Sequence, residues 1–197
     1  MKHYKFYFIL VLLSCSLTNG QKLLERKFTK VDNKIIPQKL SEIHLKKTLD
    51  KSKKTNCLSY NCSGNLKISY CNYKTEDNYV EYQELGTFDH SKIIVVEKMT
   101  YNEESYILIN QKLCTQITLH GFLLKIEKSN KYVTYNNPST DKPYIIQIIN
   151  IISGITTIQD EIILPEYIKL KRLYSLKSNE AYILDVKDKL WKTTIRN

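Results

Sequence analysis

"SYILINQKLCTQITL", residues 105–119, contains two short runs rich in Ile, Tyr and Thr. The runs are Ser105–Asn110 and Thr115–Leu119, and polar residues lie between them. β-branched and aromatic residues in short runs are typical of strands, and a short polar connection is typical of a turn. The stretch therefore predicts two β-strands joined by a turn.

The same pattern continues along the chain from Lys67 onward, with apolar and polar residues alternating at a period of two. Asn, Asp, Gly and Ser clusters bound each run, and turn signals recur roughly every 8–12 residues, as in meanders, sandwiches and blades. We therefore expect an all-β fold, an antiparallel meander arranged as a small propeller-like blade array or an irregular β-sandwich. The further predicted strands are Tyr79–Leu85, Lys92–Lys98, Phe122–Glu127, Lys131–Asn136, Tyr144–Ile151, Ile155–Gln159, Lys169–Leu176, Glu180–Val186 and Lys189–Ile195.

Three of these segments contain a tyrosine-led apolar run, and the three tyrosines are equally spaced. "YILIN" begins at Tyr106, "YIIQI" at Tyr144 and "YILDV" at Tyr182, in steps of 38 residues, and each follows a polar turn. One step earlier lies Ile68, again in a turn followed by a strand. A period near 40 with several short strands per unit is typical of propeller blades. Chance spacing in an Ile- and Tyr-rich β-protein is the alternative.

The segments "SYILINQKLCTQITLHG", "SNKYVTYNN" and "YIIQIINIISG" resemble the blades of WD-type and related propeller proteins. In such blades a strand, a turn, a second strand, a polar turn and a third strand follow one another. The segments also resemble short secreted bacterial proteins of unassigned function. The resemblance extends over roughly residues 80–197, and it implies a β-blade or sandwich fold with a role in binding.

The N-terminus has the pattern of an export signal. A basic start is followed by the apolar run Phe6–Leu13, and no further charge occurs before Lys22. This pattern predicts a signal peptide over residues 1–20. Alternatively, Leu12–Cys15 resembles a bacterial lipobox, and cleavage before Cys15 would leave a lipid anchor there. Both routes predict a secreted protein or one of the periplasm or cell envelope.

Residues 21–55 differ in composition from the rest of the chain. A partial apolar stripe predicts a helix over Lys39–Lys53, so we interpret this segment as a linker with a short helical arm. Residues 56–197 then form a disulfide-stapled β domain.

Three cysteines lie within "CLSYNCSGNLKISYC", residues 57–71. The gaps between them do not match those of a zinc site, and no base partner indicates a catalytic thiol. With Cys15 removed or lipidated, an even number remains, which in an oxidising compartment predicts two disulfides. The three pairings of Cys57, Cys62, Cys71 and Cys114 are open, and we favour Cys57–Cys62 with Cys71–Cys114.

The sequence lacks the standard catalytic signatures. It contains no GxSxG elbow, HExxH motif, phosphate-binding glycine loop or EF-hand loop. The turns hold the carboxylate pairs Glu103–Glu104 and Asp160–Glu161 and the histidines His90 and His120, which we interpret as solvated turn residues. We therefore expect no enzyme, no cofactor and no metal.

Tyrosines and one long loop are the best candidates for a binding surface. The chain has 15 tyrosines, and tyrosine is favoured at interfaces, although strands also favour it. "NPSTDKP", residues 137–143, is the longest predicted loop. The candidate surface residues are Tyr101, Tyr132, Tyr135, Asp141, Lys142 and Tyr167.

The formal net charge of +10 accompanies a composition rich in Lys, Asn, Ile and Tyr. We interpret it mainly as compositional background, although cationic proteins do associate with acidic surfaces. The expected partner is a protein or an envelope glycan, with an acidic partner as one option, and the export signal disfavours nucleic acid. Membrane contact is expected only through a lipid anchor.

Three functions are consistent with these features. The first is a non-catalytic, envelope-associated binding protein. The second is an immunity or inhibitor protein against an exported toxin or hydrolase. The third, which we favour least, is a hydrolase with a site assembled from dispersed Asp, Glu and His.

Overall fold

The computed structural model describes most of the chain beyond its first residues. The predicted leader, Cys15 and Asp141 lie outside the described residues, as do residues 48–53 of the predicted helix. The described ranges are 26–32, 40–47, 56–75, 77–88, 93–126, 129–138, 142–177 and 179–196.

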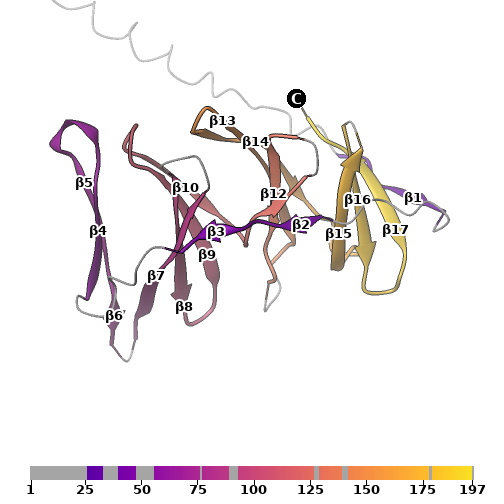
Figure 1. Ribbon diagram of the computed structural model, residues 1–197. Coiled ribbons are helices and arrows are strands. Elements are labelled where there is room, and N and C mark those ends of the chain that lie inside the picture. Colours follow the sequence, from indigo (N-terminus) through magenta and orange to yellow (C-terminus); the bar gives the residue numbers. More distant parts are fainter. Residues whose placement is uncertain are drawn as a thin grey trace, which may run out of the picture.

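The described residues form four antiparallel sheets that stand in a row (Figure 1). The first sheet contains β4 (Cys57–Asn61) and β5 (Lys67–Cys71), and the second has β7 (Tyr79–Phe88), β8 (Ile93–Thr100), β9 (Glu104–Asn110) and β10 (Thr115–Leu119), with β6 (Tyr73–Lys74) at its edge. The third contains β11 (Leu124–Lys125), β12 (Lys131–Tyr135), β13 (Ile145–Ile152) and β14 (Ile155–Ile163), and the fourth β15 (Leu170–Lys177), β16 (Glu180–Asp185) and β17 (Leu190–Thr194). The fold is all-β and antiparallel. Each of the eleven predicted strands has a counterpart with shifted ends, the largest changes being the shortening of Phe122–Glu127 to Leu124–Lys125 and the extension of Ile155–Gln159 to Ile163.

The sequence of β8 explains how the second sheet packs on both sides. Successive side chains of a strand point to opposite faces. Ile93 and Val95 therefore pack against the third sheet, whereas Ile94 and Val96 pack against the first. A strand buried on both faces needs an unbroken apolar run, which is what "IIVV" supplies.

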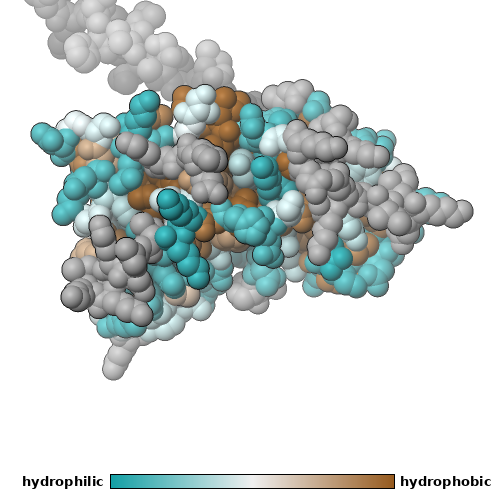
Figure 2. Space-filling model, in the orientation of Figure 1, coloured by the Kyte–Doolittle hydropathy of each residue, from teal (hydrophilic) through white to brown (hydrophobic). Residues whose placement is uncertain are grey.

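Among the described residues, three apolar cores fill the spaces between the four sheets. The first core lies between the first and second sheets, the second core between the second and third, and the third core between the third and fourth. In the third sheet, Ile146 and Ile148 belong to the third core, and Ile149 belongs to the second core. Figure 2 shows apolar surface gathered near the middle of the row, among hydrophilic residues.

The 38-residue spacing corresponds to one step along this row. The three tyrosine-led segments form β9, β13 and β16, and each strand is the middle one of three consecutive antiparallel strands in its sheet. Ile68, one step earlier, lies in β5 of the first sheet. Equally spaced segments therefore occupy successive sheets.

Residues 26–32 and 40–47, here called the N-terminal segment, run beside three of the sheets (Figure 1). It contributes β1 (Thr29–Val31) beside β17, β2 (Ser41–Glu42) beside β11 and β3 (Leu45–Lys46) beside β7. The chain then forms the first sheet and returns through the second, third and fourth. Each of these three sheets therefore includes one strand from the start of the chain.

The predicted helix over Lys39–Lys53 is wrong for the residues that the structure describes. Residues 41–46 hold two strands, and the described residues form no α-helix. Ile43 and Leu45 are half-buried while Glu42, His44 and Lys46 are exposed, which is a period of two. Free sheet edges at β11 and β7 supply hydrogen-bond partners that outweigh a weak helical stripe.

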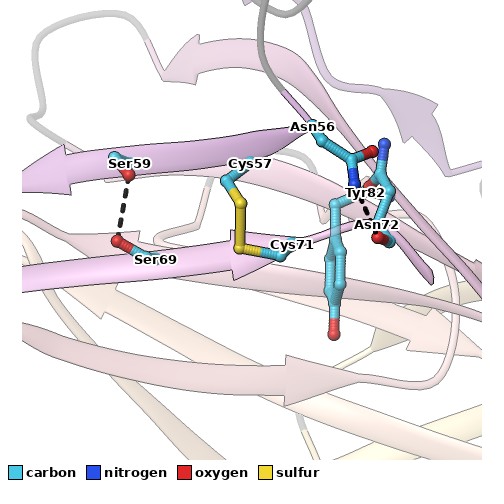
Figure 3. Close-up of a disulfide and its surroundings, with 7 residues drawn as sticks. All are labelled: Asn56, Cys57, Ser59, Ser69, Cys71, Asn72 and Tyr82. Atoms are coloured by element: carbon cyan, nitrogen blue, oxygen red, sulfur yellow. Dashed lines mark hydrogen bonds between the residues drawn. A yellow bond between two sulfur atoms is a disulfide. The ribbon is translucent and has the colours of Figure 1, made fainter.

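The favoured disulfide pairing is also wrong, because Cys57 bonds to Cys71 (Figure 3). The two residues lie opposite each other at the end of β4 and β5, with Cα atoms 4.0 Å apart. Cys62 lies beyond the far end of β4, and an extended strand advances about 3.3 Å per residue, so Cys57 is out of its reach. A hydrogen bond of 2.9 Å between the Ser59 and Ser69 hydroxyls also joins the two strands.

Candidate functional site

A cleft of about 830 Å³ opens between the second and third sheets. One wall comes from the start of β9 and the turn after β10, and the other comes from the end of β12 and the start of β13. Glu42, in the N-terminal segment, also lines it. The cleft thus collects side chains from segments far apart in the sequence.

A tight turn places two carboxylates at one wall. The Thr100 amide donates to the Glu103 carbonyl at 2.9 Å, and the Glu103 amide donates to the Thr100 hydroxyl at 3.0 Å. Glu103 and Glu104 follow this turn and line the cleft. Lys142, from the opposite wall, forms an ion pair with Glu103.

Tyr106 connects two carboxylates beside the cleft. Its hydroxyl contacts Glu104 and lies 3.2 Å from Oε1 of Glu97 on the neighbouring strand. Burial, followed by the hydrogen bond with Glu104, raises the pKa of the Tyr106 hydroxyl, which therefore stays protonated. Burial also raises the pKa of Glu97, although the hydrogen bond with Tyr106 opposes that shift.

The turn after β10 brings a histidine and a close backbone approach. The His120 amide donates to Oε1 of Gln147 at 3.0 Å, and its Nε2 lies 3.8 Å from Oε2 of Glu161. A Cβ atom at Gly121 would collide with the carbonyl oxygen of Tyr135. Only glycine, which has no Cβ atom, allows the turn after β10 to approach the backbone at the end of β12 this closely.

Asn136 holds the opposite wall in place. Its side-chain amide donates to the Pro143 carbonyl at 3.0 Å, and its Oδ1 accepts the Ile145 amide at 2.6 Å. These bonds close the base of the long loop that was predicted over residues 137–143. Tyr135 and Lys142, on either side, line the cleft.

The predicted binding residues do not form one surface. Of the candidates that the structure describes, only Tyr135 and Lys142 line the cleft. Tyr101 is 62% exposed and stacks on Tyr79, with ring centroids 5.2 Å apart. Tyr132 packs against Phe88 in the second core, 5.6 Å between centroids.

Tyr167 lies away from the cleft, in the turn between β14 and β15. It is 61% exposed, and its ring lies 5.6 Å from that of Trp191 in the fourth sheet. Tyrosines occur in all four sheets and in the turns between them, so a position near the end of a predicted strand does not show which tyrosines share a surface.

Sequence reasoning missed Glu42, Glu104 and His120 as members of one site. The 38-residue spacing is a sequence signal that could have predicted which turns come together at this site. The turns "YNEES" and "STDKP" precede Tyr106 and Tyr144 at the same phase, and stacked sheets bring equivalent turns together. The ion pair between Glu103 and Lys142 joins these two turns.

The described part of the chain shows neither a cluster of metal ligands nor a helix that could span a membrane. No three His, Cys, Asp or Glu side chains there are arranged to hold a metal ion. No helix among these residues is long and apolar enough to cross a membrane.

Comparisons with family models, with curated protein sequences and with solved structures find no match to this chain. The fold and the cleft are therefore the basis for any functional assignment. The disulfide is compatible with an extracellular or periplasmic location.

Proposed function

We propose that this protein is an exported binding protein whose cleft holds a segment of a neutral or amine-bearing glycan. The observation that carries the proposal is the pairing of Glu103 and Glu104 with the aromatic side chains Tyr106, Phe122 and Tyr135 around one cleft. Carboxylates accept strong hydrogen bonds from hydroxyl and amine groups. Aromatic faces can pack against the apolar C–H faces of sugar rings.

The charge of the cleft argues against an acidic ligand at this site. Among the described residues, three carboxylates (Glu42, Glu103 and Glu104) line it together with one lysine, Lys142. The chain as a whole carries +10, so the cleft is locally opposite to the rest of the molecule. A polyanion would meet repulsion here, whereas a hydroxyl-rich or cationic ligand would not.

The size of the cleft supports a ligand of a few chemical groups. Small-molecule sites enclose roughly 300–1,000 Å³, and the cleft volume of about 830 Å³ lies in that range. A glycan chain could enter along the open side, with one segment bound inside.

The compartment is inferred from two observations. The leader pattern at residues 1–20 predicts export, and the Cys57–Cys71 disulfide is of the kind that persists in oxidising compartments. Envelope or extracellular glycans are abundant there. The two observations together favour an envelope or extracellular glycan over a ligand of the cytosol.

A hydrolase is the second candidate, because carboxylates and a histidine gather at the cleft. Glycosidases use a pair of carboxyl groups, one kept protonated by its surroundings. Glu97 has a raised pKa through burial and shares Tyr106 with Glu104. Glu97 itself does not line the cleft, and Lys142 engages Glu103, so we favour binding.

The test is an oligosaccharide array containing neutral, amine-bearing and acidic chains, followed by calorimetric titration of the ligands that bind. We expect neutral or amine-bearing chains to bind. Tyr135→Ala and Glu104→Gln should each weaken binding by roughly tenfold or more, a loss of about 1.4 kcal/mol or more. Tyr167→Ala is the matched control outside the cleft and should leave the affinity unchanged.

Three outcomes contradict the proposal. They are binding of acidic chains alone, equal affinity in the Tyr135→Ala variant, and loss of affinity in Tyr167→Ala. Release of new reducing ends from a bound chain, abolished by Glu104→Gln, would instead support the hydrolase.

A further inference from the structure

The connection after β4 lies directly against the turn between β9 and β10. The Ser63 amide donates to the Gln111 carbonyl at 3.2 Å, and Nε2 of Gln111 donates to the Asn61 carbonyl at 3.3 Å. These two hydrogen bonds lie on either side of Cys62 in the sequence. The end of the first sheet is thereby held against the second at this point.

Cys62 and Cys114 meet at this contact. Neither is disulfide-bonded, both are half-buried, and their thiols are in hydrogen-bonding contact with each other. That contact raises the pKa of the Cys62 thiol to about 11. Cys57 and Cys71 are already bonded to each other, so these two thiols are each other's remaining partners among the described cysteines.

The turn carrying Cys114 is held firmly by Asn110. Oδ1 of this buried asparagine accepts the amides of Lys112 and Leu113, at 2.9 and 3.0 Å. Cys114 itself has φ +55°, in the left-handed region where glycine is favoured. A cysteine at this position suggests that its side chain is needed there.

We propose that Cys62 and Cys114 form a second disulfide, which fastens the first sheet to the second. The two thiols lose two protons and two electrons as the S–S bond forms. The oxidant is a disulfide of a protein or of a small thiol, and it is reduced to two thiols. The reaction passes through a mixed disulfide between the oxidant and one of the two cysteines.

The first sheet has a structural need for such a link. It contains only β4 and β5, and an isolated two-stranded sheet is marginally stable in water. The Cys57–Cys71 bond joins these strands to each other but not to the rest of the molecule. The proposed bond connects the hairpin to the turn that follows β9.

The test is a disulfide map of the full chain refolded in a buffer of oxidised and reduced glutathione. Free thiols are alkylated first, so that no exchange occurs during digestion. Trypsin cuts after Lys54, Lys67 and Lys112, and chymotrypsin cuts after Tyr60. The second cut separates the two cysteines that trypsin leaves on one peptide.

We expect one linked pair of peptides with Cys57 and Cys71 and a second with Cys62 and Cys114. Two results overturn the proposal. One is any other pairing of the four cysteines, either Cys57–Cys114 with Cys62–Cys71 or Cys57–Cys62 with Cys71–Cys114. The other is alkylated Cys62 and Cys114 beside an intact Cys57–Cys71 bond. The map uses the unaltered protein and does not depend on any variant folding.

Serine variants separate a covalent bond from simple packing. Cys62→Ser, Cys114→Ser and the double variant should all lower the Tm of the oxidised protein by the same amount, roughly 5–10 °C. After reduction, the variants and the unaltered protein should melt together. A different result would show that the two residues act by packing alone. In that case the two single variants would lower the Tm by unequal amounts, the double variant would show their sum, and the differences would persist after reduction.

Discussion

Asp160 and Arg26 form an ion pair that solvent scarcely reaches, with side chains 5% and 12% exposed. Both guanidinium nitrogens donate to the carboxylate, at 2.7 and 2.9 Å, and the Arg196 amide donates to it at 2.8 Å. Burial alone would raise the pKa of Asp160, but the hydrogen bonds from Arg26 and Arg196 outweigh it and lower the pKa. The carboxylate thus links the third sheet to both ends of the described chain.

Asp160→Asn should lower the free energy of unfolding by about 3 kcal/mol at pH 7, because it leaves a nearly buried guanidinium without its counter-charge. The pKa of Asp160 is lower in the folded state than in the unfolded state. Its stabilising effect is therefore complete above the unfolded pKa of about 4 and is lost as the pH falls through the folded pKa. Urea unfolding at pH 7, 5 and 3 should show the difference between variant and parent closing at the lowest pH.

The control for that experiment is Asp188→Asn, which alters an exposed ion pair. Nζ of Lys171 lies 2.6 Å from Asp188, but the two side chains are 51% and 69% exposed. Exposed pairs contribute little, so stability should hardly change. An equal loss in both variants would contradict the special role of Asp160.

Gly121→Ala should destabilise the protein by about 1–3 kcal/mol, because the added methyl group must displace the backbone at Tyr135. The same displacement should move the two walls of the cleft. Gly64→Ala is a useful comparison, because Gly64 has φ +75° but nothing within 4 Å of its added Cβ. Its cost, about 1 kcal/mol, comes from the backbone alone, and urea unfolding of both variants measures the difference.

At the level of elements, the N-terminal segment covers an edge of three sheets. Leu40 is buried in the third core, and Ile43 and Leu45 pack against the second. β3 approaches β7 so closely that a Cβ at Gly86 would lie 2.6 Å from the Lys46 carbonyl oxygen. These contacts are tertiary, although each strand has only two or three residues.

A chain lacking residues 1–47 should lose amide protection in β7, β11 and β17, since each of these strands loses its neighbour. The matched control lacks residues 1–25 only and keeps the whole segment. Hydrogen exchange with mass spectrometry compares the two proteins. Equal protection of the three strands in both would contradict a structural role for the segment.

The extent to which the elements were predictable follows from their length. Strands such as β8 and β13 are long and rich in Ile and Val, so composition and period identify them. β2 and β3 are two residues each, too short to show a period, and their pairing depends on sheet edges far along the chain. The same limit applies to the site, because Glu42 and Glu104 come to line one cleft only through the stacking of sheets.

At the level of the whole molecule, the three cores share the two central sheets. Val95 and Val96 are adjacent in β8, both fully buried, and they face different cores. The first core has the smallest set of buried residues and lies at one end of the row. Damage to it should stay local, whereas damage to the second core should reach the whole protein.

Val95→Ala and Val96→Ala should each cost about 2 kcal/mol in free energy of unfolding. Val96→Ala should also reduce amide protection in β4 and β5 selectively, because local openings follow the weakest contacts. Val95→Ala should leave those strands no less protected than the rest. Urea unfolding and hydrogen exchange measure both effects, and identical exchange patterns would contradict separate cores.

The pairing of β1 with β17 has a consequence in time. Thr29 of β1 lies opposite Lys192 of β17. During synthesis β1 leaves the ribosome early, and it can pair only after β17 has been made. At roughly 5–20 residues per second, that delay is about 10–30 s. The second sheet can begin to form once β10 is made, but the fourth can close only after synthesis is nearly complete. β1 is therefore made early but is among the last strands to reach its position in a sheet.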